Sequence, residues 1–173
     1  MRGKGNDGKG NVPDRDLWET KKDLFDKLNN RFHFDFDCCA NNDNKKCERY
    51  TEDFERIISL DQVDWVCWMN PPFSKALEMF THFFKVVKRG VAIYRCDNMD
   101  TLIWQETIFP HVDWIFIPEG RIPYDQPYGV ADTKKRNVSR FPSALIGVGL
   151  DIPKDIKGRI LFLRQEKKEE KSP

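Results

Sequence analysis

The sequence predicts an α/β fold: a mostly parallel sheet with an antiparallel edge and helices on both faces. Three apolar runs, at residues 65–69, 91–96 and 112–117, have the composition of strands buried on both faces. Helix-like segments at residues 74–88 and 102–109 separate these runs. Because a helix that follows a strand returns the chain to the same end of the sheet, this alternation indicates parallel strands.

The length and composition indicate one globular domain. The 173 residues suffice for a core of their own, and 33% charged with 13% aromatic residues excludes a disordered chain. The formal net charge is +1, so no overall basicity points to nucleic acid. A surface that binds phosphate groups would therefore have to be a local patch.

The cysteines and histidines do not have the spacing of a metal site. There is no C-x-x-C pair among the five cysteines, and the three histidines are scattered. We therefore expect core cysteines and no metal. No apolar run reaches 18 residues and no signal-peptide pattern is seen, which leads us to expect a cytoplasmic protein in a reducing compartment.

Composition divides the chain into four parts. Residues 1–12 are rich in glycine and basic residues and predict a flexible arm, followed by the main domain over residues 13–165. Within it, residues 118–142 hold prolines, glycines and tyrosines and predict an irregular functional loop. The charged residues 166–173 predict a frayed tail.

The first elements are predicted from short patterns. Helical spacing favours a helix at about residues 20–30, with Thr20 as its cap. Residues 32–37 alternate phenylalanine with polar residues, which predicts a strand with its three phenylalanines on one face. The small residues 38–40 would let a cofactor approach the backbone, although a hairpin edge fits the composition equally well. Residues 45–62 favour a short helical stretch.

The most informative stretch is the apolar run 65–69 followed by Asn70-Pro71-Pro72-Phe73. Two prolines cannot continue a sheet ladder, so the strand must end there and Asn70 is held on a stiff corner before a helix. In open α/β sheets, ligands bind at such corners.

This corner offers specific chemistry. The Asn70 side-chain carbonyl and the Pro71 backbone carbonyl are two acceptors suited to the two hydrogens of an amino group. Phe73 offers a face for a planar ring, worth ~1–3 kcal/mol if the ring is a base. The alternative is a proline-rich turn with Phe73 in the core.

The later elements complete the sheet. The helix at 74–88 is expected to end at Arg89-Gly90, and the helix at 102–109 at Pro110. Residues 143–150 and 159–164 predict two closing strands that pair antiparallel with each other across a turn.

The loop 118–142 interleaves aromatic and basic residues, among them Tyr124, Lys134, Lys135 and Arg136. This composition suits a grip on a nucleic-acid backbone. A flexible surface loop is the alternative.

Several short motifs occur in the order in which they occur in the phage-type, Dam-like DNA N6-adenine methyltransferases, and the chain resembles that family. The motifs are Trp18-Glu19-Thr20, Phe36-Asp37-Cys38-Cys39-Ala40, Asn44-Lys45-Lys46-Cys47, Asn70-Pro71-Pro72-Phe73, Asp100-Thr101 with Trp104, Gly120-Arg121-Ile122 with Tyr124, and Pro142-Ser143-Ala144-Leu145.

The resemblance implies a Rossmann-like fold and methyl transfer from S-adenosylmethionine to adenine N6 in double-stranded DNA, with the target base flipped out and no metal. It assigns the cofactor to Trp18, Thr20, Asp37, Cys38 and Ala40. It assigns catalysis to Asn70, Pro71, Pro72 and Phe73, and substrate binding to Asp100, Thr101, Trp104 and Arg121. The composition of the loop adds Tyr124, Lys134, Lys135 and Arg136 to the predicted substrate-binding residues.

Three alternatives stay open on the residues alone. Cytosine N4 also presents an amino group beside a ring nitrogen, and a non-catalytic DNA-binding relative could keep the fold. Methylation of a protein glutamine is disfavoured by the basic residues between 134 and 140.

Overall fold

The computed structural model describes residues 16, 18–60, 63–122, 124–125 and 141–164. The predicted arm 1–12, the tail 166–173 and most of the loop 118–142 lie outside the described residues. No helix in the described part of the chain has the length and apolar character needed to cross a membrane.

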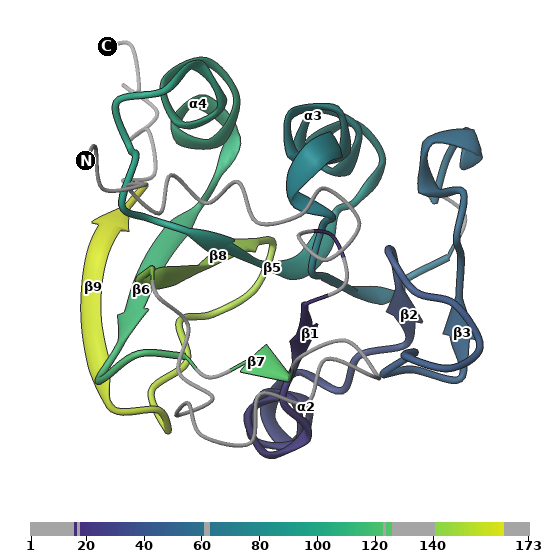
Figure 1. The fold of residues 1–173 in the computed structure, drawn as a ribbon, viewed down its shortest axis with the longest axis horizontal. Helices are drawn as coiled ribbons and strands as arrows, with labels where there is room; N and C mark the ends of the chain where they lie inside the picture. The colour runs from purple at the N-terminus through teal and green to yellow at the C-terminus, as the bar shows by residue number, and fades with distance from the viewer. Residues whose placement is uncertain (1–15, 17, 61–62, 123, 126–140, 165–173) are drawn as a thin grey trace, which may run out of the picture.

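Seven strands form the main sheet of the described residues (Figure 1). In spatial order they are β3 (Arg49–Tyr50), β2 (Phe36–Asp37), β4 (Val66–Met69), β5 (Arg89–Arg95), β8 (Ser143–Val148), β6 (Trp114–Pro118) and β9 (Gly158–Leu163). The neighbours from β3 to β5 pair parallel, whereas β5–β8, β8–β6 and β6–β9 pair antiparallel. The fold is therefore mixed α/β, and the predicted mostly parallel sheet holds for one half only.

The predicted pairing of the two closing strands with each other is wrong. Strand β6 lies between β8 and β9 and pairs with both. The reason is visible at Gly147 in β8, where a side chain would come within 2.0 Å of the Trp114 indole on β6. The missing side chain leaves room for the indole beside β8, and a single glycine in a sequence does not indicate such a partner.

Helices cover both faces of the sheet, as predicted (Figure 1). Helix α3 (Ala76–Val86), the π-helix η3 (Ile103–Ile108) and α4 (Phe109–His111) share one hydrophobic cluster on one face. Helix α2 (Lys22–Phe32) packs into a second cluster on the opposite face. Because β4 contributes Met69 to the first cluster and Trp68 to the second, it is buried on both faces, as its apolar run predicted.

A second, two-stranded sheet lies next to the first. Strand β1 (Glu19–Thr20) pairs antiparallel with β7 (Tyr124–Asp125), with Thr20 opposite Tyr124. Thr20 is therefore a strand residue and not the cap of α2, whose N-cap position is Lys21 and has no side-chain cap. The predicted helix at 20–30 is confirmed with its start at Lys22.

The predicted strand at 32–37 is mostly wrong. Phe32 ends α2, and His33 closes the helix in the left-handed conformation, with φ 55°. Only Phe36–Asp37 forms a strand. Phe34 packs with the α2 cluster and Phe36 with the α3 cluster, so these rings lie on opposite faces of the sheet.

Three further boundaries differ from the prediction. The short helical stretch predicted within residues 45–62 is confirmed only as the 3-10 helix η1 (Phe54–Arg56), and strand β3 precedes it. Arg89 and Gly90 are the first residues of β5 and not the end of the preceding helix. A side chain at Gly90 would lie 2.8 Å from the Cys67 carbonyl of β4, so the glycine allows the two strands to pair closely. Pro110 stands inside α4 and does not end the preceding helix.

Candidate functional site

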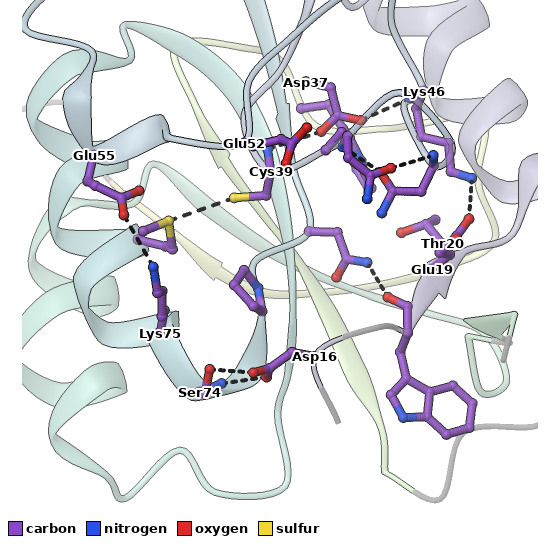
Figure 2. Close-up of a pocket in the computed structure, with 18 residues that line it drawn as sticks. Asp16, Glu19, Thr20, Asp37, Cys39, Lys46, Glu52, Glu55, Ser74 and Lys75 are labelled. Atoms are coloured by element: carbon purple, nitrogen blue, oxygen red, sulfur yellow. Dashed lines mark hydrogen bonds and ion pairs between the residues drawn. The ribbon is translucent and has the colours of Figure 1, made fainter. Parts of the chain in front are cut away.

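A cavity of about 280 Å³ opens where β2 and β4 end (Figure 2). Asp37 is the last residue of β2 and Asn70 directly follows β4, so the two polar side chains meet at one edge of the sheet. The described residues that line the cavity are Asp16, Trp18, Glu19, Thr20, Asp37, Cys39, Ala40, Asn41, Asn44, Lys46, Glu52, Glu55, Trp68, Asn70, Pro72, Ser74, Lys75 and Met79.

Asn70 is half-buried in the cavity wall, and its side chain has a defined direction. Its Nδ2 donates a hydrogen bond of 2.9 Å to the backbone carbonyl of Trp18. Because the amide nitrogen is used in this bond, the carbonyl oxygen Oδ1 is the atom that can accept a hydrogen from a bound molecule.

The rest of the motif divides between wall and core. Pro72 lines the cavity, while Pro71 is buried. Phe73 is half-buried and does not line the cavity. Its ring meets Phe141 edge-on with centroids 5.2 Å apart and is tilted against Tyr94 at 6.1 Å.

Asp37 is a buried acid with backbone donors around it. Its carboxylate accepts hydrogen bonds from the backbone N–H groups of Lys46, at 3.0 Å, and Cys39, at 3.3 Å. Burial raises the pKa of Asp37 to about 6, against the lowering effect of these two bonds and of the Lys46 charge. The carboxyl group therefore changes its charge near neutral pH.

Thr20 places a hydroxyl group in the cavity wall without a partner. The residue is 1% exposed, and among the described residues its Oγ1 has no hydrogen-bond partner. Buried polar atoms are nearly always paired, so an unpaired hydroxyl in a cavity wall is evidence for a ligand that completes the bond.

One of the two residues predicted to line the cofactor site within residues 38–40 does not reach the cavity. Ala40 lines the cavity, but Cys38 is fully buried and Cys39 takes its place in the wall. Cys39 contacts the Met79 sulfur at 3.8 Å, and burial raises its pKa well above the ordinary range. A raised pKa disfavours the thiolate form, so the thiol offers the cavity a neutral surface.

The cavity is acidic. Five carboxylate side chains line it, against two lysines. Lys46 pairs with Glu19 at 3.4 Å, and Lys75 pairs with Glu55 at 3.3 Å (Figure 2). Both lysines are thus engaged by carboxylates, and the excess negative charge favours a cationic ligand.

None of the described residues predicted to bind the substrate lines the cavity. Trp104 is fully buried and donates to the Arg95 carbonyl at 3.2 Å, and Tyr124 is buried with its hydroxyl 2.9 Å from Ser143 Oγ. Asp100 and Arg121 are exposed, and Thr101 is half-buried. Lys134, Lys135 and Arg136 lie outside the described residues.

The structure adds site residues that the sequence analysis missed. Asp16 lies 58 residues before Ser74, yet its carboxylate accepts hydrogen bonds from both the backbone N–H, at 2.8 Å, and the Oγ of Ser74 (Figure 2). Asn41 and Asn44 also line the cavity. Two of these residues carried a signal, since Ser74 directly follows the Asn-Pro-Pro-Phe motif and Asn44 opens the motif Asn44-Lys45-Lys46-Cys47.

No group of three or more His, Cys, Asp or Glu side chains within the described ranges has the geometry of a metal site.

Comparisons with known proteins agree on one family. The family described as DNA N-6-adenine-methyltransferase (Dam) matches residues 8–172. A DNA N-6-adenine-methyltransferase of Haemophilus phage HP1 (strain HP1c1) is 35% identical over 66 residues, which are 37% of this chain. The matched part spans 38% of that relative. No solved structure gives a significant match.

Proposed function

The chain belongs to the DNA N-6-adenine-methyltransferase (Dam) family, and from this premise we propose that it transfers a methyl group from S-adenosylmethionine to the N6 amino group of adenine in DNA. The acceptor corner after β4 and the acidic cavity beside it support this activity. Domain 13–165 would carry it.

The orientation of Asn70 is the observation that carries the proposal. Its Nδ2 is bonded to the Trp18 carbonyl, so Oδ1 is the side-chain acceptor beside the cavity. The Pro71 backbone carbonyl has no N–H of its own residue to compete with it. The two oxygens would accept the two hydrogens of the target amino group.

These two acceptors would make the target amino nitrogen a better nucleophile. The lone pair of an amino group on an aromatic base is delocalised into the ring, which makes the nitrogen a poor nucleophile. Acceptors on both hydrogens favour the pyramidal nitrogen that develops positive charge as the new N–C bond forms and the sulfur–methyl bond breaks. S-adenosylhomocysteine would be the leaving group, and the methylated nitrogen would then release one of its two hydrogens as a proton to solvent. Both acceptors are fixed by the fold before the substrate arrives, so no reorganisation is needed in the transition state.

The cavity residues fit S-adenosylmethionine, which carries a net positive charge and many hydrogen-bonding groups. The unpaired Thr20 hydroxyl and the acidic lining match such a ligand. We assign Trp18, Thr20, Asp37, Cys39 and Ala40 to this site. Cys38 is buried and would act only through its neighbours in the chain. The bound cofactor supplies an already activated methyl group. The parallel strands from β3 to β5 would then form the cofactor-binding half of a Rossmann-like sheet.

DNA would present the target base outside the duplex. Extrusion costs a few kcal/mol of stacking and pairing. Phe73 is the proposed stacking surface, because its half-buried ring leaves part of its area accessible. Lys134, Lys135 and Arg136 would contact the phosphates, which a chain of net charge +1 can do only through a local patch.

A duplex that lacks the reacting group tests this proposal. Transfer of labelled methyl groups should be measured on a DNA duplex and on the same duplex with purine, which has no amino group, in place of every adenine. We expect labelling of the first and none of the second. Labelling of both duplexes would contradict adenine N6 and favour cytosine N4, whereas labelling of neither would favour the non-catalytic DNA-binding alternative.

A further inference from the structure

One short segment touches both the cavity and the corner that follows β4. The carboxylate of Asp16 accepts two hydrogen bonds from Ser74, and the carbonyl of Trp18 accepts the hydrogen bond from Asn70. Asn70 and Ser74 flank the two prolines and Phe73, so residues 16 and 18 hold the motif at both of its ends.

The helix that starts at this corner depends on the distant carboxylate. Helix η2 (Phe73–Lys75) and α3, which follows it directly, have no side-chain cap at their own N-cap positions, Pro72 and Lys75. Asp16 accepts the Ser74 N–H in the first turn and brings negative charge to it, as an N-cap residue does. The contact thereby fixes where η2 begins relative to the acceptor corner.

The Trp18 carbonyl decides which atom of Asn70 meets the substrate. The side-chain amide has a donor end and an acceptor end of nearly the same shape. If the Trp18 carbonyl moved away, the amide could turn and present its NH₂ group to the target amino group, donor against donor. Correct placement of residues 16 and 18 is therefore a condition for the acceptor geometry.

The same segment continues into the cofactor cavity. Trp18, Glu19 and Thr20 all line it, and the Thr20 hydroxyl is the buried atom without a partner. A ligand that bonds Thr20 fixes the strand whose preceding residue orients Asn70. Residues 18–20 thus connect the proposed cofactor site, through Thr20, with the proposed base site, through the Trp18 carbonyl and Asn70.

We propose, on the basis of the proposed function, that Asp16 and the Trp18 carbonyl are positioning groups that orient Asn70 and make the binding of cofactor and target base cooperative. They act on the target base through Ser74 and Asn70. The loss of the Asp16 contact should reduce kcat and the coupling between the two ligands; because Asp16 and Ser74 also line the cavity, the coupling is measured with the cofactor analogue at a saturating concentration for each variant.

The test compares wild type with Asp16→Ala, Ser74→Ala and the double variant. DNA affinity is measured by fluorescence anisotropy with and without S-adenosylhomocysteine, the unreactive product of the cofactor. In wild type we expect this ligand to raise DNA affinity about tenfold, within the usual range of allosteric coupling. In Asp16→Ala, which removes both hydrogen bonds, the factor should fall below about threefold. Ser74→Ala removes only the hydroxyl bond and keeps the backbone N–H bond, so its factor should fall less, and the double variant should be no worse than Asp16→Ala.

Two further variants separate positioning from general stability. Ser74→Thr keeps the hydroxyl and should retain the coupling. Asp26→Asn removes a carboxylate of the exposed Lys22–Asp26 pair on α2, far along the chain from the corner, and should also retain it.

Unchanged coupling in Asp16→Ala and Ser74→Ala, or an equal loss in Asp26→Asn, would overturn the inference. A wild type that methylates DNA but shows no coupling would overturn it while leaving the proposed function intact. A wild type that binds no cofactor and methylates no DNA would instead remove the proposed function itself.

Discussion

The side-chain amide of Asn70 donates a hydrogen bond of 2.9 Å to the backbone carbonyl of Trp18, 52 residues earlier in the chain. This bond joins the corner after β4 to the segment that leads into β1. It gives the motif a direction that the sequence alone could not specify, since it settles which end of the amide is available as an acceptor.

Asn70→Ala should lose most methyl transfer and keep cofactor binding. Removing one fixed acceptor of this kind typically costs about 10²–10³ in kcat. Asn70→Asp keeps an acceptor but loses the donor to Trp18, so its kcat should lie between wild type and Asn70→Ala. Single-turnover kinetics with calorimetry of S-adenosylhomocysteine binding measures both effects, and unaltered turnover in Asn70→Ala would discard the acceptor role.

Thr20→Val should stabilise the ligand-free protein and weaken cofactor binding. The substitution keeps the shape but removes a buried hydroxyl without a partner, which costs about 1–3 kcal/mol when left unpaired. We expect the midpoint temperature of thermal unfolding to rise and the cofactor affinity to fall about tenfold. Thr20→Ser keeps the hydroxyl and serves as the control. A Thr20→Val protein with wild-type affinity would show that the hydroxyl meets no ligand.

Asp37 should give the ligand-free protein a specific pH dependence of stability. Its pKa is about 6 in the folded protein, above the ordinary value of 3.8, so between these values the folded state holds more protons than the unfolded state. The contribution of this group to the free energy of unfolding is therefore fully present below pH ~4 and is lost as pH rises through about 6.

Urea denaturation of wild type and Asp37→Asn from pH 4 to pH 8 measures this effect. The other carboxyl groups titrate in both proteins, so the difference between the two isolates Asp37. The stability of wild type relative to Asp37→Asn should decline up to about pH 6 and then level off. A difference that is constant over the whole range would show that the carboxyl group is not desolvated.

Phe73→Ala should raise KM for DNA, whereas Phe73→Tyr should be tolerated, because a stacking surface needs an aromatic ring of similar size. Loss of base stacking costs about 1–3 kcal/mol. Phe84 is a partly buried phenylalanine on α3 that stacks on His111, and Phe84→Ala is the matched control for lost packing. Equal effects of Phe73→Ala and Phe84→Ala on KM would mean that Phe73 is an ordinary packing residue.

The sequence was most informative where structure is set by local pattern. The apolar run of β4, the proline corner and the amphipathic spacing of α3 each lie within a few neighbouring residues, and all three elements are confirmed. Asn70, Asp37 and Thr20 line one cavity, and the roles that the motifs assign to them stay predictions.

The rest depends on contacts between distant parts of the chain. Strands β1, β2 and β3 have two residues each, too few for any periodicity to appear. The place of β8 between β5 and β6 follows from packing of the Trp114 indole against Gly147, a fit between two strands. Asp16 carries no motif, and its role emerges only when the fold places it beside Ser74.

Trp104 and Tyr124 show what the order of motifs leaves undecided. Both were assigned to the substrate pocket, and both are buried, with side-chain hydrogen bonds to Arg95 and Ser143. An aromatic residue with a polar tip looks the same in a sequence whether its tip meets a ligand or the protein. Any part they take in substrate binding would have to pass through the elements that they support.

Mass spectrometry of nucleosides shows whether the protein methylates adenine at N6 in DNA. The protein is incubated with duplex DNA and S-adenosylmethionine that carries a heavy-isotope methyl group, and the DNA is then digested to nucleosides. We expect wild type to form N6-methyladenine that bears the label, and we expect the yield of this product to be at least about a hundredfold lower with Asn70→Ala. Labelled N4-methylcytosine without labelled N6-methyladenine, or no labelled nucleoside at all, would contradict this expectation.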